Sequence, residues 1–290
     1  MTGTLNDEMT AGFGGYFPTW CPGCGNFGIW AALKNAFKKM NLDPEKMAVV
    51  YGIGCSGNMN DFLWVNSFHG LHGRAVPVAV GIKIANHELP VIAVVGDGDC
   101  YGEGGNHLLH ACRGNHDITV VVHDNRVYGL TTGQVAPTAL KGFKAKSTPA
   151  GIIEVPVDPI ALALSQGATY VAQGFSGDLV HLADLIVRGV EHKGFSLVNI
   201  FQPCVTFNHL TTYQWYRERI YKLDTTNHDP ADLKKAFQVN LESGDKYPIG
   251  VLYESNRPTY TDSLAQLSES TLVSRSPHPD RIEKLASEFV

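Results

Sequence analysis

The sequence has few charged residues and no long hydrophobic run. Only 18% of its 290 residues are charged and 44% are hydrophobic, whereas soluble domains usually carry roughly 25% charged residues. This balance favours a sheet that is buried on both faces and a large contact with another subunit. No apolar stretch approaches the roughly 18 to 20 residues that span a bilayer, so we expect no membrane association.

A basic surface and an export signal are also missing from the sequence. The formal net charge is −5 and no basic stripe is present, which argues against a nucleic-acid partner because such a protein must neutralise phosphates. The first residues, MTGTLNDEMTAG, contain neither a basic segment nor an apolar segment of a signal peptide. We therefore expect a soluble, cytoplasmic protein.

Six cysteines stand out in this sequence. They lie at positions 21, 24, 55, 100, 112 and 204. Without an export signal, such cysteines favour a metal or redox role over structural disulfides. Cys112 lies in the apolar pattern HLLHACRG and is expected to be a core residue, and Cys100 is expected to be equally ordinary.

Hydrophobic periodicity predicts helices that alternate with buried strands. A helix is expected from Asn26 to near Asn41, where apolar residues recur at helical spacing and lysines gather at the end. Such alternation predicts an α/β fold with a mostly parallel sheet flanked by helices on both faces. The strand candidates are KMAVVYG, VIAVVGDG, ITVVVHDN, ATYVAQ and SLVNIFQPC, and the other helix candidates are GGNHLLHACRG, DPIALALSQG and GDLVHLADLIVRGVEHKG.

The pattern changes twice along the chain. Residues 134–158 contain three prolines and little periodicity, so we expect a long functional loop. After about Asp224 a polar helix, a strand and a tail with SRSPHPDR follow. We therefore expect an α/β domain over residues 1–224 and a C-terminal extension over residues 225–290 that docks on this domain or on a partner subunit.

Four of the cysteines are predicted to meet at one edge of the sheet. Cys21 and Cys24 begin a helix, Cys55 follows the next strand, and Cys204 follows the strand SLVNIFQ. A helix start and the end of the following strand lie at the same edge of an α/β sheet. A redox dithiol, a zinc site and a [4Fe–4S] cluster all remain open on spacing alone.

Two glycine-rich turns differ in their value as evidence. YGIGCSG has the spacing of a dinucleotide-binding turn, but no Asp or Glu occurs between Phe62 and His87 to hold a ribose. Its glycines instead allow Cys55 and Ser56 to face the site. In the second turn, a buried strand leads to Gly96-Asp97-Gly98, and the next strand ends at Asn125, 27 residues after Gly98.

Asp97 and Asn125 are candidate magnesium ligands. Carboxylate and amide oxygens are the ligands that magnesium prefers, and magnesium usually keeps phosphate oxygens and water in its other positions. Gly96 and Gly98 leave room for a diphosphate, as do Gly104 and Gly105 at a helix start that offers free amide groups. An Asp that merely caps a helix would explain the first motif alone, but not the paired Asn125.

Taken together, these motifs resemble the β subunits of the 2-oxoacid:ferredoxin oxidoreductases. The resemblance rests on WCPGCG, GIGCS, HGRA, the GDG…N pair, YGLTTGQ and QPCVTFN, between about Thr19 and Phe207, and it resumes in YPIGVLYESNRPTY. It implies the thiamine-diphosphate-binding fold, specifically the domain that binds the diphosphate, followed by a C-terminal docking arm. It also implies that Cys21, Cys24, Cys55 and Cys204 hold one [4Fe–4S] cluster.

The resemblance further implies which residues bind thiamine diphosphate and Mg²⁺. Asp97, Asn125 and the main-chain oxygen of Val127 would bind Mg²⁺. The cofactor would be lined by Ile53, Gly54, Cys55, Ser56, His72, Gly73, Arg74, Gly96, Gly98, Asp99, Gly129 and Leu130. His72 is a candidate acid–base catalyst, although a lone histidine often only packs or caps. Thr132 is a second catalytic candidate, because relatives vary at this position close to the substrate.

In this family a 2-oxoacid is decarboxylated oxidatively, coenzyme A takes the acyl group, and electrons leave through the cluster. The length and the C-terminal pattern favour 2-oxoglutarate, with a pyruvate or broad-specificity member as the alternative. A cluster-free thiamine-dependent decarboxylase or synthase subunit with a structural zinc is a further alternative, and a non-enzymatic zinc protein is a third.

Two absences in the sequence point to partners. No glutamate is clearly placed to activate thiamine, and Glu103 belongs to the diphosphate side. We therefore expect a larger α subunit to supply it, in a heterodimer or a dimer of heterodimers. The chain also lacks a compact CxxCxxCxxxCP run for a second cluster, so an external ferredoxin is the expected electron acceptor.

Overall fold

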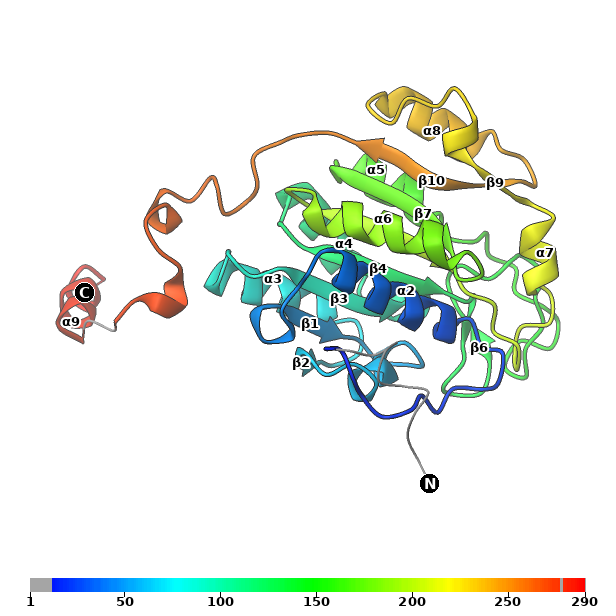
Figure 1. The fold of residues 1–290 in the computed structure, drawn as a ribbon, viewed down its shortest axis with the longest axis horizontal. Helices are drawn as coiled ribbons and strands as arrows, with labels where there is room; N and C mark the ends of the chain where they lie inside the picture. The colour runs from blue at the N-terminus through cyan, green and yellow to red at the C-terminus, as the bar shows by residue number, and fades with distance from the viewer. Residues whose placement is uncertain (1–11, 277–278, 290) are drawn as a thin grey trace.

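The computed structural model describes residues 12–276 and 279–289. Within this part of the chain an eight-stranded sheet forms the centre of the molecule (Figure 1). Six neighbouring strands are parallel, β10 pairs antiparallel with β7, and β9 extends this edge. In spatial order the strands are β2 (Asn66–His69), β1 (Ala48–Tyr51), β3 (Val91–Gly96), β4 (Thr119–Asp124), β8 (Ser196–Phe201), β7 (Tyr170–Phe175), β10 (Tyr247–Glu254) and β9 (Ile220–Lys222).

Helices cover both faces of this sheet, as the sequence predicts. Side chains alternate along each strand, so that Val94 of β3 joins the core beneath α2 (Asn26–Lys39) and α6 (Leu179–Glu191), and Ala93 joins the opposite core. The opposite face is covered by α3 (Ala75–Ala85), α4 (Gly105–Gly114), α5 (Pro159–Ser165) and α8 (Leu233–Leu241). The smaller elements are α7 (Tyr213–Arg217), α9 (Pro279–Ser287), the hairpin of β5 (Val127–Tyr128) and β6 (Gln134–Val135), the 3₁₀ turns η1 (Pro44–Lys46), η2 (Gly57–Asp61), η4 (Leu223–Thr225), η5 (Ala265–Leu267) and η6 (Leu272–Ser274), and the π-helical turn η3 (Gly98–Glu103).

The expected fold class is confirmed, and most expected elements are present. The first predicted helix ends at Lys39, and Asn41 then adopts a left-handed conformation with φ of 51°. Residues 136–158 contain no helix or longer strand, in agreement with the predicted loop. The elements that were not predicted include α3, which is apolar on nearly every side, and β2, whose four residues are all exposed at the sheet edge.

The C-terminal segment first docks on the body of this chain. The Arg257 guanidinium donates hydrogen bonds to the main-chain oxygens of Cys112, Arg113 and Gly167. Asn115 Nδ2 donates to the main-chain oxygen of Arg257 in return. Beyond this anchor the chain leaves the sheet, and α9 lies apart from it in Figure 1. The division into residues 1–224 and 225–290 stays a prediction, although β10 within the second range belongs to the sheet.

Two expectations concern segments outside the sheet. The first concerns the start of the chain, where the sequence shows no signal-peptide pattern; residues 1–11 lie outside the described residues. Across 12–276 and 279–289, every helix is too short or too polar to cross a bilayer.

Two helical glycines give a matched test of how α2 is seated. A Cβ atom at Gly28 in α2 would lie 2.1 Å from the main-chain oxygen of Ser176, whereas one at Gly81 in α3 would meet nothing within 4 Å. We expect Gly28→Ala to force α2 away from the β7–α6 loop and to lower the thermal unfolding midpoint by roughly 3–10 °C. Gly81→Ala should leave the midpoint unchanged or raise it slightly, because alanine favours a helix. A Gly28→Ala protein as stable as the wild type would contradict this packing.

Candidate functional site

Two neighbouring cavities lie at the edge where β1, β3, β4 and β8 end. The first, here called the Asp97 cavity, has a volume of about 80 Å³. The second, the cysteine cavity, has a volume of about 220 Å³. They share wall residues Cys55, Asn125, Gly129 and Leu130, so a group bound in one lies beside a group bound in the other.

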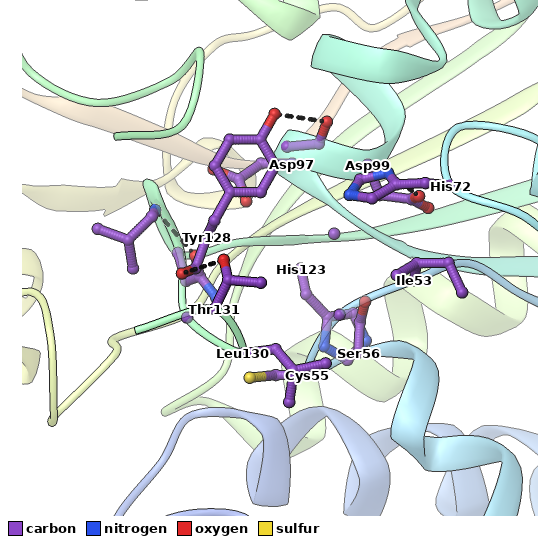
Figure 2. A pocket seen from close by; sticks show the side chains of 16 residues that line it. Ile53, Cys55, Ser56, His72, Asp97, Asp99, His123, Tyr128, Leu130 and Thr131 are labelled. Carbon is purple, nitrogen blue, oxygen red and sulfur yellow. Dashed lines mark hydrogen bonds and ion pairs between the residues drawn. The ribbon is translucent and has the colours of Figure 1, made fainter. Parts of the chain in front are cut away.

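Most residues predicted to bind a cofactor surround the Asp97 cavity (Figure 2). In the figure the side chains of Asp97 and Asp99 lie at the top of this space, and Cys55 and Leu130 lie at the bottom. The cavity is lined by Ile53, Gly54, Cys55, Ser56, His72, Gly96, Asp97, Gly98, Asp99, His123, Asn125, Val127, Tyr128, Gly129, Leu130 and Thr131.

Asp97 follows β3 and is fully enclosed. Its Oδ2 accepts hydrogen bonds from the Arg126 N–H at 2.9 Å and from the Thr138 hydroxyl. Burial, together with the nearby Asp124 carboxylate, raises the pKa of Asp97 to about 7. A cation in the cavity would favour the ionised form, so this carboxylate is suited to a metal ligand.

The turn after β4 presents Asn125 and Val127 to the same cavity. Asn125 Oδ1 accepts a hydrogen bond from the Val127 N–H at 3.0 Å, and Arg126 between them has a left-handed φ of 66°. The Arg126 guanidinium is buried among four aromatic rings whose centroids lie 5.4 to 5.9 Å from its Cζ atom. These cation–π contacts anchor the turn from behind. The rings belong to Phe201, Trp215, Tyr216 and Tyr247.

Asp99 organises the opposite wall. Its Oδ1 accepts a hydrogen bond from the Gly73 N–H at 2.7 Å and lies 2.9 Å from His72 Nδ1. Burial raises the pKa of Asp99, and its Oδ2 has no hydrogen-bond partner. The Ser56 hydroxyl in the same wall is also buried without a partner. Such buried polar atoms cost free energy unless a ligand satisfies them.

The glycines of the GDG motif leave space for ring packing. A Cβ atom at Gly98 would lie 2.3 Å from the Tyr128 ring, and the Tyr128 hydroxyl donates to the main-chain oxygen of Gly98 at 3.2 Å. Gly98 begins the π-helical turn η3, a distortion that occurs frequently at functional sites.

Gly73 and Arg74 do not line either cavity. Gly73 supports Asp99 from behind, and Arg74 Nη1 turns away to donate to the main-chain oxygens of Gly73 and Glu103. Thr132, with a left-handed φ of 78°, lines the cysteine cavity and not the Asp97 cavity. Their predicted roles in cofactor binding and catalysis stay predictions.

Three residues of the Asp97 cavity were not predicted from the sequence: His123, Tyr128 and Thr131. His123 could have been found, because it lies near the end of β4, two residues before Asn125, and alternate residues along a strand share a face. Its ring is buried, which lowers the pKa of His123 to about 3 and keeps the ring neutral. Its Nδ1 lies 2.8 Å from Asn26 Oδ1.

The four cysteines predicted to meet at this edge do line one cavity. The Trp20 indole N–H donates to the main-chain oxygen of Cys55 at 2.7 Å, and the Gly25 N–H donates to that of Pro203 at 3.1 Å. Gly129 lies between two of the sulfurs, because a Cβ atom there would be 3.4 Å from Cys55 Sγ and 3.8 Å from Cys204 Sγ. Cys112 and Cys100 lie in the core instead, as expected.

The electrostatics of the cysteine cavity disfavour a redox dithiol. Burial raises the pKa of Cys24 to about 12 and that of Cys55 to about 11, and the neighbouring sulfurs add to the effect. Reactive dithiols need a lowered pKa, whereas a bound metal displaces the thiol protons. Within the described residues, no three His, Cys, Asp or Glu side chains converge as ligands of a single ion. The sulfurs border a cavity instead, which suits a larger, polynuclear group.

One asparagine joins the two cavities. Asn208 Nδ2 donates to the main-chain oxygen of Asn125 at 3.1 Å, and the Asn208 N–H donates to that of Cys204 at 3.0 Å. The loop that carries Cys204 is therefore fixed to the turn that carries Asn125. In the described chain no glutamate lines either cavity, and Glu103 lies outside both at the end of η3.

Comparisons with known proteins agree with this arrangement. Residues 52–200 match the family model of the thiamine pyrophosphate enzymes, C-terminal TPP binding domain, and residues 204–269 match the C-terminal family model of the pyruvate ferredoxin oxidoreductase beta subunit. The 2-oxoacid:ferredoxin oxidoreductase subunit beta of a Sulfolobus species is 44% identical over 278 residues, which is 91% of each chain. The 2-oxoglutarate synthase subunit KorB of Archaeoglobus fulgidus is 36% identical and covers 86% of this chain and 89% of its own.

A solved structure is also similar. It is a 2-oxoglutarate:ferredoxin oxidoreductase from Magnetococcus marinus with 2-oxoglutarate, coenzyme A and succinyl-CoA bound. It shares 40% sequence identity with a TM-score of 0.87, over 94% of this chain and 92% of that chain. With the two family models and the relatives above, this places the chain in the β-subunit family of the 2-oxoacid:ferredoxin oxidoreductases, with a thiamine-diphosphate-binding domain.

Proposed function

We propose that this chain is the β subunit of a coenzyme A-dependent 2-oxoglutarate:ferredoxin oxidoreductase, which converts 2-oxoglutarate to succinyl-CoA and CO₂. The observation that carries the proposal is the shared wall of the Asp97 and cysteine cavities, which makes an organic cofactor and an electron carrier neighbours. The relative from Magnetococcus marinus binds 2-oxoglutarate, coenzyme A and succinyl-CoA, which favours 2-oxoglutarate over pyruvate.

The Asp97 cavity is suited to thiamine diphosphate and Mg²⁺. Asp97, the Asn125 amide oxygen and the main-chain oxygen of Val127 would hold the metal, and the partnerless Ser56 hydroxyl would meet the cofactor. When bound, thiamine diphosphate supplies the electron sink for decarboxylation. Gly96 keeps the backbone open to it, whereas the space beside Gly98 is occupied by the Tyr128 ring.

The cysteine cavity is suited to one [4Fe–4S] cluster. Cys21, Cys24, Cys55 and Cys204 would be its ligands, because all four line one cavity and such a cluster takes four cysteine ligands. When bound, the cluster supplies one-electron transfer, with ferredoxin as the acceptor.

His72 is the proposed acid–base residue of the Asp97 cavity. His72 Nδ1 lies 2.9 Å from Asp99 Oδ1, so this carboxylate would orient the ring and leave Nε2 to exchange a proton with a substrate. Thr132 borders the cysteine cavity, so its hydroxyl would contact a substrate that reaches across Leu130. The glutamate that activates thiamine would come from an α subunit, since the described residues place none at either cavity.

The direct test of the function is activity with and without the partner. The chain should be purified anaerobically with a co-expressed α subunit, and viologen reduction should be measured with several 2-oxoacids. We expect activity only in the complex, dependent on coenzyme A, and at least tenfold higher kcat/KM for 2-oxoglutarate than for pyruvate. A complex that carries every cofactor but reduces viologen with none of the acids would contradict the proposal. A preference for pyruvate would overturn only the assignment of 2-oxoglutarate as the substrate.

Metal analysis distinguishes the cluster from a structural zinc. We expect about four iron and four sulfide per β chain in the wild type, and less than a quarter of this in Cys204→Ala. Cys112→Ala is the matched control, because Cys112 is buried in the core away from both cavities. Stoichiometric zinc without sulfide in the wild type would favour the cluster-free alternative.

Asp97→Asn tests the metal ligand with little change of shape. Loss of the charged oxygen should weaken Mg²⁺-dependent binding of thiamine diphosphate about 100-fold or more, measured by calorimetry. Asp184→Asn on α6, which removes an exposed ion pair with Lys39, should leave the affinity unchanged. Equal affinities of the Asp97→Asn variant and the wild type would exclude Asp97 as a ligand.

A further inference from the structure

Two buried polar side chains connect the wall of one cavity with the wall of the other. His123 at the end of β4 lines the Asp97 cavity, and Asn26 at the start of α2 lines the cysteine cavity. His123 Nδ1 lies 2.8 Å from Asn26 Oδ1, and the side chains are 1% and 0% exposed. The contact joins residues 97 positions apart, so the fold and not the local sequence creates it.

Each of these side chains keeps one polar atom without a partner. The atoms are His123 Nε2 and Asn26 Nδ2, and both are buried. A buried donor or acceptor without a partner costs free energy, so two of them in a single contact are strongly unfavourable. Because each residue lines a cavity, a ligand in that cavity is the natural partner of the orphaned atom.

The chemistry of the contact determines which atoms donate. Asn26 Oδ1 can only accept, so the proton of the neutral ring must be on His123 Nδ1. His123 Nε2 then presents a lone pair and needs a donor in the Asp97 cavity. Asn26 Nδ2 carries two protons and needs an acceptor on the side of the cysteine cavity.

Sulfur is the acceptor available on that side. The main-chain N–H of Asn26 already forms a hydrogen bond with Cys24, and Gln202 Nε2 donates to Cys24 Sγ at 3.4 Å. One donor at the start of α2 and one directly after β8 are therefore directed at Cys24, which lines the cysteine cavity. Thiolate and sulfide of an iron–sulfur cluster accept such bonds, and these bonds help to set its reduction potential.

We infer that His123 and Asn26 form a hydrogen-bonded bridge between the two cofactors, an inference that rests on the proposed function. Asn26 Nδ2 donates to a sulfur of the cluster, and His123 Nε2 accepts a hydrogen bond from the 4′-amino group of thiamine diphosphate. His123 also fixes the Asn26 amide, because its Nδ1–H holds Oδ1 and thereby turns Nδ2 towards the sulfur. Both are positioning residues, and the bridge ties cluster potential to cofactor binding.

Substitutions can separate the contribution of Asn26 from that of His123. Asn26→Leu removes the donor to sulfur at similar side-chain size. His123→Leu removes both ring nitrogens, whereas His123→Asn keeps a donor at the place of Nδ1 and loses only Nε2. His192→Leu is the matched control, since His192 is also buried and hydrogen-bonded, to Thr169, away from both cavities.

The experiment uses the anaerobic complex with the α subunit. The midpoint potential of the cluster is measured by redox titration followed by electron paramagnetic resonance, and thiamine diphosphate affinity is measured by calorimetry with Mg²⁺. Asn26→Leu should lower the potential, because the reduced cluster loses a donor. His123→Leu should lower the potential and weaken cofactor binding roughly five- to twentyfold. His123→Asn should weaken binding but keep the potential near the wild-type value, and His192→Leu should change neither.

The outcomes that overturn the inference are distinct from failure of the proposed function. A wild-type complex without iron, sulfide or bound thiamine diphosphate would overturn the proposed function and also the bridge, which rests on it. A complex with full cofactors whose potential is unchanged in Asn26→Leu would overturn the hydrogen bond to sulfur. Unchanged affinity of His123→Leu for thiamine diphosphate would overturn the hydrogen bond between the cofactor and His123 Nε2. If the Asn26→Leu protein holds no iron, the potential is measured in Asn26→Ala instead.

Discussion

The site depends on one constraint, that parallel strands all end at the same edge of their sheet. β1, β3, β4 and β8 are consecutive neighbours, and the residues just beyond their ends are Cys55, Asp97, Asn125 and Cys204. Burial of apolar side chains on both faces fixes the register of these strands. Two thiols, a carboxyl group and an amide are thereby brought to a common rim, and the turn before α2 adds Cys21 and Cys24 to it.

The loops beyond the strands convert this rim into two connected cavities. Gly129 lies between the sulfurs of Cys55 and Cys204 and also borders the Asp97 cavity, so the wall between the cavities is thin. Asn208 ties the Cys204 loop to the turn at Asn125. The buried Arg126 guanidinium holds that turn against the aromatic cluster behind it. Under the proposed function, such a wall would give electrons a short route out of the organic cofactor.

How far the sequence could be interpreted follows from the range of each signal. Strand periodicity and the common edge of parallel strands sufficed to bring Asp97, Asn125 and the four cysteines to one rim. The contact between His123 and Asn26 could not be predicted, because it depends on how α2 crosses the end of β4. The apolar surface of α3 gave no amphipathic signal, since α3 packs against the sheet and against α4. The HGRA motif placed Gly73 and Arg74 near the cofactor, but side-chain direction, which turns Arg74 away, is set by tertiary contacts.

The central claim is that an iron–sulfur cluster and a magnesium diphosphate occupy adjoining cavities on this rim. The most direct measurement is anomalous diffraction at the iron edge from anaerobic crystals of the complex grown with thiamine diphosphate and Mg²⁺. The account predicts a strong iron signal among Cys21, Cys24, Cys55 and Cys204, with diphosphate density between Asp97 and Asn125 across Gly129. An iron signal elsewhere, a single zinc among the cysteines, or diphosphate remote from Asp97 would contradict it.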